Sequence, residues 1–220
     1  MKITKFAQSC LLIEVLGKKI LIDPGVIKFK DSYLEEEWAS VDVVLVTHKH
    51  ADHCHAVAIE RILKNSDAKL YSSSEVAREF PRLPVSVVRE GDVLFFDKLK
   101  VEVVRAVHGW IPKFKNGLAV KENIGFIIDD GKNRVYHTSD TICFDNDYKC
   151  DVVFLPVVNH GVVMGPWEAA RFAKLVGAKL VVPVHYDNPE HPADFDLVKK
   201  EFGDLNLDYK ILNIEESIKL

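Results

Sequence analysis

One apolar run that ends in clustered histidines constrains this chain more than any other feature. Residues 41–47 are apolar apart from Asp42 and the closing threonine, which predicts a central strand covered on both faces. The strand runs directly into His48-Lys49-His50-Ala51-Asp52-His53. Three imidazoles and a carboxylate within six residues strain the packing of a strand end unless a cation compensates them. The segment therefore predicts a metal site at the edge of a sheet.

Further metal-ligand residues follow three other predicted strands. The strands at residues 99–107, 134–138 and 179–184 run into His108, Ser139-Asp140 and His185, respectively. Loops beyond the strand ends of an α/β sheet gather at one rim, so side chains placed there can converge. The candidate metal ligands are therefore His48, His50, Asp52, His53, His108, Asp140 and His185.

The order of the predicted elements indicates a single domain over residues 1–220 with a four-layer α/β/β/α sandwich. Short strands come first, a helix follows the central strand, and the same order returns in weaker form, which favours two mixed sheets with helices on their outer faces. Residues 209–213 are expected to return as an edge strand. Helices are predicted at residues 53–64, 71–80, 166–177 and 193–202, the last one closed by Gly203.

Composition argues against several kinds of partner. The formal charge of -4, from 29 basic and 33 acidic residues, gives no electrostatic case for binding nucleic acid. No stretch approaches the roughly 20 consecutive apolar residues of a membrane span. The oligomeric state stays open. Reduced thiols in a cytoplasmic protein are expected, because no C-x-x-C spacing occurs among Cys10, Cys54, Cys143 and Cys150.

The donor set indicates a catalytic metal site. Imidazole and carboxylate ligands without thiolate suit Zn²⁺, Mn²⁺ or Fe²⁺, with zinc the first expectation, whereas structural zinc sites prefer cysteine-rich tetrahedra. Two divalent ions combined with Asp52 and Asp140 would leave a net charge of about +2. Such a centre can hold a bridging hydroxide and attract a small anionic substrate.

Other polar residues near the predicted strand ends are weaker candidates. His160 ends a strand on the same rim and could reach a substrate. His55 is expected on a helix surface, His137 in the core and His191 in a loop. One further set could orient the imidazoles, with ordinary turn chemistry as the alternative: Asp23, Thr47, Thr138 and Thr141. Another set could bind an anion, with a solvated loop as the alternative: Arg105, Lys113 and Lys115.

Several short motifs are spread along nearly the whole chain. They are Ser9-Cys10, Leu21-Ile22-Asp23-Pro24, the string from Thr47 to His53, His108, His137-Thr138-Ser139-Asp140-Thr141, Met164-Gly165-Pro166 and Pro183-Val184-His185-Tyr186. With them the chain resembles the metallo-β-lactamase superfamily, and within it the small metal-dependent hydrolases related to ascorbate-6-phosphate lactonase. Two positions depart from the pattern: Gln8, where many relatives carry histidine, and Ser139, where glycine is usual.

The resemblance implies a role for each ligand. His48, His50 and His108 would hold one ion, Asp52, His53 and His185 the other, and Asp140 would bridge the two. The hydroxide between the ions would attack an ester, lactone or phosphoester bond. Asp52 would orient or deprotonate the attacking water, and His185 or a nearby group would protonate the leaving group.

Two other functions stay open from the sequence. The same scaffold could hold an iron pair for redox chemistry, although diiron relatives usually carry glutamate at the position of His50. The chain could also be a metal-bound sensor or interaction module without activity. Whether Gln8, Lys113 or His160 contacts a substrate depends on loop geometry, which one sequence does not define.

Overall fold

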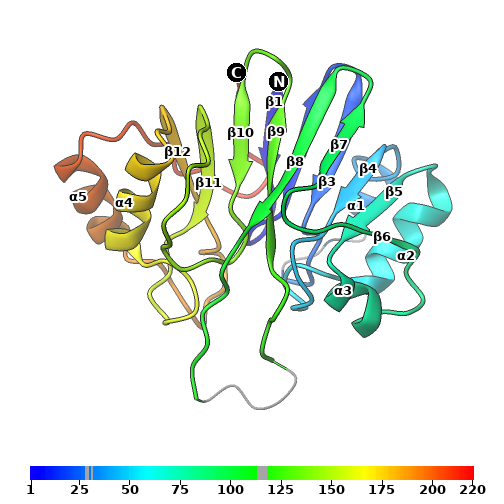
Figure 1. The fold of residues 1–220 in the computed structure, drawn as a ribbon, viewed down its shortest axis with the longest axis horizontal. Helices are drawn as coiled ribbons and strands as arrows, with labels where there is room; N and C mark the ends of the chain where they lie inside the picture. The colour runs from blue at the N-terminus through cyan, green and yellow to red at the C-terminus, as the bar shows by residue number, and fades with distance from the viewer. Residues whose placement is uncertain (28–29, 31, 113–117) are drawn as a thin grey trace.

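Two β-sheets pack face to face, and helices cover both outer faces (Figure 1). The computed structural model describes residues 1–27, 30, 32–112 and 118–220. The predicted four-layer α/β/β/α sandwich is confirmed. Among these residues, none of the helices combines the length and the apolar character needed to span a bilayer.

The first sheet has seven strands and the second has six, counted over the described residues. The spatial order of the first sheet is β13 (Ser217–Lys219), β1 (Lys2–Lys5), β2 (Leu11–Val15), β3 (Lys18–Ile22), β4 (Val43–Leu45), β5 (Lys69–Ser72) and β6 (Val85–Val87). That of the second is β12 (Leu180–Val184), β11 (Val152–Pro156), β10 (Arg134–His137), β9 (Ile124–Asp129), β8 (Leu99–Arg105) and β7 (Val93–Phe96).

Both sheets are mixed. Strands β3 to β6 are parallel in the first sheet and β10 to β12 in the second, and the remaining neighbours are antiparallel. The first sheet is covered by α1 (Ser32–Glu35), α2 (Ala56–Asn65) and α3 (Ser74–Glu79), and the second by α4 (Pro166–Leu175) and α5 (Phe195–Asp204) (Figure 1).

The central strands are apolar on both faces because both faces are covered. In β4, Val43 and Leu45 point into the core between the sheets, whereas Val44 points into the core beneath the helices. In β11, Phe154 joins the inter-sheet core and Val153 packs under α4 and α5. A continuous apolar run is therefore what each strand needs, and polar residues can begin only where the strand ends.

Two predicted elements differ from the structure: the helix predicted at residues 71–80 begins later, as α3, and the strand predicted at residues 209–213 is not formed. A helix over residues 71–80 is not formed as a unit, because Tyr71 continues β5 opposite Leu45, and Ser73 caps a shorter α3 by accepting from the Val76 N–H. Residues 209–213 are not a strand: Tyr209 makes one isolated bridge to Val181. The chain then crosses to the other sheet, where β13 pairs with β1.

The end of the last helix also differs from the prediction. Gly203 lies inside α5 and does not close it, since the helix continues to Asp204. The residue with left-handed backbone is Asn206, at φ 48°. Asparagine tolerates this conformation better than most side chains, so it can turn the chain without a glycine.

Strands β4, β8, β10 and β12 all end at the side of the sandwich away from the two chain termini (Figure 1). The pairing explains this, because β1 and β13 run antiparallel and bring both termini to the opposite side. The loops that follow the four strands therefore share one rim.

Candidate metal centre

The seven candidate ligands meet at this rim. They form three overlapping groups, and within each group the donor atoms lie within 4.8 Å of one another. The shared members join all seven residues into one cluster. The groups are His48, His50 and His108; His48, His53 and Asp140; and Asp52, His53 and His185.

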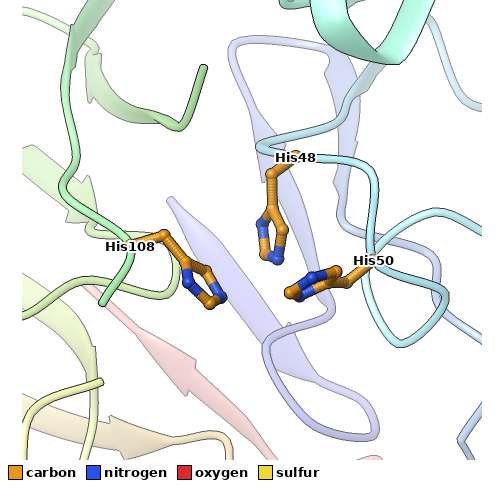
Figure 2. A group of neighbouring side chains, drawn as sticks. All are labelled: His48, His50 and His108. Atoms are coloured by element: carbon orange, nitrogen blue, oxygen red, sulfur yellow. The ribbon is translucent and has the colours of Figure 1, made fainter. Parts of the chain in front are cut away.

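Three imidazoles from two segments point toward one another (Figure 2). The ring centroid of His48 lies 4.8 Å from that of His50 and 5.2 Å from that of His108. The rings of His50 and His108 are 4.8 Å apart. His108, which follows β8 in the second sheet, therefore completes a group begun by the loop after β4 in the first sheet.

Asp23 orients two of the imidazoles from the outside. The Nδ1–H of His53 donates to Asp23 Oδ2 at 2.8 Å. Thr47 Oγ1–H donates to the same carboxylate at 2.8 Å, so the Thr47 oxygen accepts from the Nδ1–H of His48 at 3.0 Å. Both rings are thereby held as tautomers whose Nε2 atoms carry the lone pair and face the cluster.

Main-chain carbonyls orient two more imidazoles. The Nδ1–H of His108 donates to the Gly109 oxygen at 2.7 Å, which leaves Nε2 for an ion. The Nε2–H of His50 donates to the Leu118 oxygen at 2.7 Å, which leaves Nδ1 instead. The outer bonds therefore define the donor atom that each ring presents.

The second half of the cluster contains both carboxylates. His185 Nε2 lies 3.0 Å from Asp140 Oδ2 and 3.3 Å from Asp52 Oδ2, and His53 Nε2 lies 3.3 Å from Asp140 Oδ1. Burial alone would lower the pKa of His185, but Asp140 and Asp52 outweigh burial and raise this pKa to about 10. Burial likewise opposes protonation of His53, while Asp140, Asp52 and Asp23 raise its pKa. Without metal, protonated imidazoles would thus balance the carboxylates.

The inner atoms of the cluster suit a divalent cation. Among the residues that the structure describes, buried His48 Nε2 has no hydrogen-bond partner, and buried His53 Nε2 and Asp140 Oδ1 have none beyond their mutual approach of 3.3 Å. Burial is the main reason that the pKa of His48 is well below its ordinary value, so this ring is neutral and can act as a ligand. Buried polar atoms without partners are costly, and a bound cation would satisfy them. The residues present therefore fit a metal ion.

Four of the eight non-glycine residues with positive φ in the described part of the chain lie around the cluster. Gln8, Asp23, Ser139 and His185 have φ values of 55°, 50°, 63° and 63°, respectively, although none is glycine. Left-handed backbone costs such residues about 1 to 2 kcal/mol each, so surrounding contacts must maintain it. Strained backbone of this kind is common at catalytic and ligand-binding sites, where it holds side chains in functional positions at a cost in stability.

A hydrogen-bond chain supports the strained backbone at Ser139. Ser139 Oγ–H donates to Asn123 Oδ1 at 2.6 Å, and Asn123 Nδ2 donates to the Asp140 main-chain oxygen at 2.6 Å. This chain links the residue that replaces the usual glycine to the main chain of the adjacent carboxylate. The departure at Ser139 thus leaves Asp140 in place.

Gln8 connects the cluster to the loop after β12. Its side-chain Oε1 accepts from the main-chain N–H groups of Asp187 and Asn188 at 3.0 and 3.1 Å. Its main-chain N–H donates to Asp187 Oδ2 at 2.8 Å. Its Nε2 lies 3.5 Å from Asp52 Oδ2 and 3.4 Å from His185 Nε2. The buried ammonium of Lys5, 2.6 Å from Asp187 Oδ2, anchors the same loop.

A cavity of about 300 Å³ opens onto the cluster. His160 borders it, with its ring centroid 5.9 Å from that of His185 and 5.0 Å from that of His191. The sequence placed His160 on this rim, but it gave no reason to expect His191, Asn188 or Leu118 there. The complete lining is His50, Asp52, His108, Ile111, Leu118, Asp140, His160, Val162, His185, Asn188 and His191.

Not every predicted supporting residue has the expected role. Thr138 Oγ1 donates to the Ser139 oxygen, and Thr141 Oγ1 donates to the main-chain oxygens of Val107 and Ile142. The prediction that these two threonines orient imidazoles is therefore wrong. Their hydroxyls bond to main-chain oxygens near Asp140 instead.

The other histidines and the basic residues are more peripheral. His137 is buried as expected, and its Nε2–H donates to the Ser9 oxygen at 2.8 Å. His55 precedes α2 and does not border the cavity. Arg105 lies over the Phe144 ring, 5.8 Å from its centroid. Lys113 and Lys115 lie outside the described residues.

Comparison with known proteins defines the family. The model of the beta-lactamase superfamily domain matches residues 2–185. The chain belongs to the metallo-β-lactamase superfamily. Within the superfamily, a UPF0173 metal-dependent hydrolase of Anoxybacillus flavithermus is 32% identical over 235 residues, covering 100% of both chains. This places the chain among the metal-dependent hydrolases.

Solved structures of the superfamily share the fold. Igni18, a metallo hydrolase from the archaeon Ignicoccus hospitalis, superposes with a TM-score of 0.80 at 26% identity, over 99% of this chain and 97% of its own. CmlA, a diiron β-hydroxylase from Streptomyces venezuelae, has a TM-score of 0.76 at 15% identity, over 100% of this chain and 54% of its own. The second likeness concerns the fold alone.

Proposed function

We propose that the seven clustered residues hold two divalent ions, with zinc the first expectation, and that the protein hydrolyses an ester, lactone or phosphoester bond in a small substrate. His48, His50 and His108 would hold one ion, and Asp52, His53 and His185 the other, with Asp140 between them. The observation that carries this proposal is the orientation of the rings, because outer hydrogen bonds turn one nitrogen of each of four imidazoles inward.

The metal would supply the electrophile and the nucleophile. Two bound divalent ions polarise the scissile bond and lower the pKa of a water molecule that they share, which can then attack. The net charge of about +2 at the loaded centre would stabilise the negative charge that develops on the substrate.

The protein's own groups would orient and move protons. Asp52, which borders the cavity, would orient the attacking water and accept its proton. His185, which lies between Asp52 and Asp140, is a candidate donor to the leaving group. Burial, aided by His185, lowers the pKa of His160 to about 4, so His160 is neutral at pH 7 and suits hydrogen bonding to the substrate.

The location proposed for this activity is the cytoplasm. Cys10, Cys54, Cys143 and Cys150 are all free thiols, and three of them are buried. Unpaired thiols are typical of proteins in a reducing compartment. Fractionation of cells that express a tagged full chain would test this location.

The function is tested by metal analysis combined with turnover. Protein stripped with a chelator and reloaded with Zn²⁺, Mn²⁺ or Fe²⁺ is assayed on carboxylic esters, lactones and phosphodiesters. We expect two ions per chain and turnover that falls at least about 100-fold in His50→Ala and Asp140→Ala. His55→Ala, a histidine outside the cluster, serves as the matched control and should remain active.

Two results would overturn the proposal. Binding of only one ion per chain would contradict a two-ion centre. Loaded protein that turns over none of the three bond types would contradict the proposed reaction. Iron in protein expressed without added metal, with redox-dependent optical bands, would instead favour a diiron oxidoreductase, for which CmlA shows that this fold is suitable.

A further inference from the structure

The lining of the cavity over the proposed metal centre contains two chemically different sets of residues, which we call the apolar wall and the polar wall. Apart from the proposed ligands, its lining contains three apolar residues and three polar but formally neutral ones. No lysine or arginine belongs to this lining within residues 1–27, 30, 32–112 and 118–220. The apolar wall consists of Ile111, Leu118 and Val162, and the polar wall of His160, Asn188 and His191.

The fold builds the first part of the apolar wall. The N–H of Gly109 donates to the Val162 oxygen at 2.8 Å, which holds the segment after β8 against residues 161–163. A Cβ at position 109 would lie 2.6 Å from Val162 Cα, so this approach requires glycine. Ile111 then packs on the cluster of Val158, Val162 and Val163. The apolar side chain at the cavity is therefore held by tertiary contacts.

Leu118 supplies the second part. Its carbonyl is bound to the Nε2–H of His50 at 2.7 Å, which places the residue beside the proposed metal centre. Its side chain nevertheless remains 53% exposed. A single exposed leucine is ordinary on a protein surface, but this one borders the same cavity as Ile111 and Val162. An apolar ligand there would cover surface that water now contacts.

Recognition of a charged substrate has less support from the described residues around the cavity. Arg105, which the sequence offered as an anion-binding residue, stacks over Phe144 and does not border the cavity. Positive charge in the described site would therefore come from the ions themselves and act on the reacting group. The part of the substrate outside the reacting bond would meet the apolar carbons of Ile111, Leu118 and Val162 and the hydrogen-bonding side chains of the polar wall.

We propose that the substrate is a carboxylic ester or lactone whose uncharged acyl chain lies on Ile111, Leu118 and Val162. This inference rests on the proposed hydrolytic function. In the reaction, a water oxygen bonds to the acyl carbon and the bond from that carbon to the ester oxygen breaks. The leaving oxygen takes one proton from the water, so the products are a carboxylic acid and an alcohol, joined in one molecule for a lactone.

The first test is the dependence of turnover on chain length and charge. The zinc-loaded full chain is assayed on p-nitrophenyl acetate, butyrate and hexanoate to vary chain length. To vary charge, p-nitrophenyl pentanoate is compared with the p-nitrophenyl monoester of glutarate, whose acyl chain has the same length but ends in a carboxylate. A buried methylene is worth up to about fourfold, so we expect kcat/KM to rise at least about tenfold from acetate to hexanoate. The pentanoate should exceed the glutarate monoester.

Matched variants assign the effect to the wall. Leu118→Ser and Ile111→Ser should lower the hexanoate-to-acetate ratio of kcat/KM by about fivefold. Leu16→Ser is the control, because Leu16 is 56% exposed in the turn between β2 and β3, outside the cavity lining. Its ratio should equal that of the wild type. A general loss of activity or of folded protein lowers kcat/KM equally for both substrates, so it cancels in the ratio.

The outcomes separate this inference from the proposed function. A ratio that is flat with chain length, a preference for the glutarate monoester, or a ratio unchanged in both wall variants would overturn the apolar wall. If the loaded protein hydrolyses no ester, lactone or phosphodiester, the proposed function fails, and calorimetry with acetate and hexanoate tests the wall alone. Tighter binding of hexanoate that is lost in Leu118→Ser would support it, and equal affinities would overturn it.

Discussion

The carboxylate of Asp23 links two proposed metal ligands to one buried anchor. It accepts from the Thr47 N–H, the Thr47 hydroxyl and the His53 ring, and through Thr47 it also orients His48. Its own backbone is left-handed, at φ 50°. The sequence offered Asp23 either as a residue that orients imidazoles or as ordinary turn chemistry, and its bonds to Thr47 and His53 favour the first role.

Replacing Asp23 should weaken metal binding without removing a ligand. In Asp23→Asn, the amide NH₂ group replaces one of the two acceptor oxygens, so either the Thr47 N–H or the pair of donors on Oδ2, the Thr47 hydroxyl and the His53 ring, faces a donor instead of an acceptor. We expect affinity for zinc to fall about 10- to 100-fold, measured by competition with a chromogenic chelator. Asp196→Asn, at a side chain that is 97% exposed, is the control. Unchanged affinity in Asp23→Asn would refute this role.

At the scale of elements, α3 supports the segment that carries Leu118. Glu75 Oε2 accepts from the N–H groups of Lys121 and Glu122, at 2.9 and 3.0 Å. The Glu122 carboxylate in turn accepts from the Ser74 hydroxyl and the Glu75 N–H. The Lys49 ammonium, between two proposed ligands in the sequence, lies 3.1 Å from Glu75 Oε1. Helix α3 therefore connects the segment that carries Leu118 to the loop that carries His48 and His50.

This link predicts a dependence of stability on pH. Burial raises the pKa of Glu75, but the N–H groups of Glu122 and Lys121 and the Lys49 ammonium outweigh burial and lower it below its ordinary value of 4.5. A lowered folded-state pKa adds stability above pH 4.5 that is lost as the pH falls through the folded value.

Glu75→Gln should therefore cost about 1 to 3 kcal/mol at pH 7 and little once wild-type Glu75 is protonated. Urea unfolding of both proteins at a series of pH values between 7 and 3 measures the difference. Glu35→Gln, on the exposed side of the short helix α1, is the control. A difference that does not shrink toward low pH would show that the charge of Glu75 is not responsible.

Close packing between elements gives a second prediction at this scale. Gly25 lies against the loop of the ligands, and a Cβ there would be 1.8 Å from the Asp52 main-chain oxygen. Gly25→Ala must therefore displace Asp52, and we expect loss of metal binding with at least about 2 kcal/mol of destabilisation. Metal analysis and thermal unfolding measure both effects.

Gly203→Ala is the control for this change. Its Cβ would meet no atom within 4 Å, and the residue lies inside α5. Alanine should therefore stabilise the helix by about 0.5 to 1 kcal/mol and leave metal binding unchanged. Equal behaviour of the two variants would show that the contact with Asp52 does not matter.

At the scale of the whole molecule, the centre joins the two sheets. Ligands after β4 come from the first sheet, and His108, Asp140 and His185 follow strands of the second. Because the chain must be folded for these groups to meet, metal binding and folding are thermodynamically linked.

Metal removal should therefore lower the melting temperature. A ligand at 100 times its dissociation constant adds about 2.7 kcal/mol, which corresponds to about 5 to 10 °C for a chain of this size. Scanning calorimetry before and after dialysis against a chelator, and after zinc is restored, measures the shift. The shift should shrink in Asp140→Ala, whereas an equal shift in that variant would contradict the proposed part of Asp140.

The sequence alone determined the fold class, the family and the seven proposed ligands that gather at the rim. These properties are local, because a strand buried on both faces must be apolar and polar ligands can begin only at its end. The tertiary structure decided which atom each ring presents and what borders the cavity. Those depend on contacts between distant segments, such as His50 with Leu118 and Gln8 with Asp187, 68 and 179 residues apart. No local pattern encodes such contacts, because each is set by how the two sheets pack.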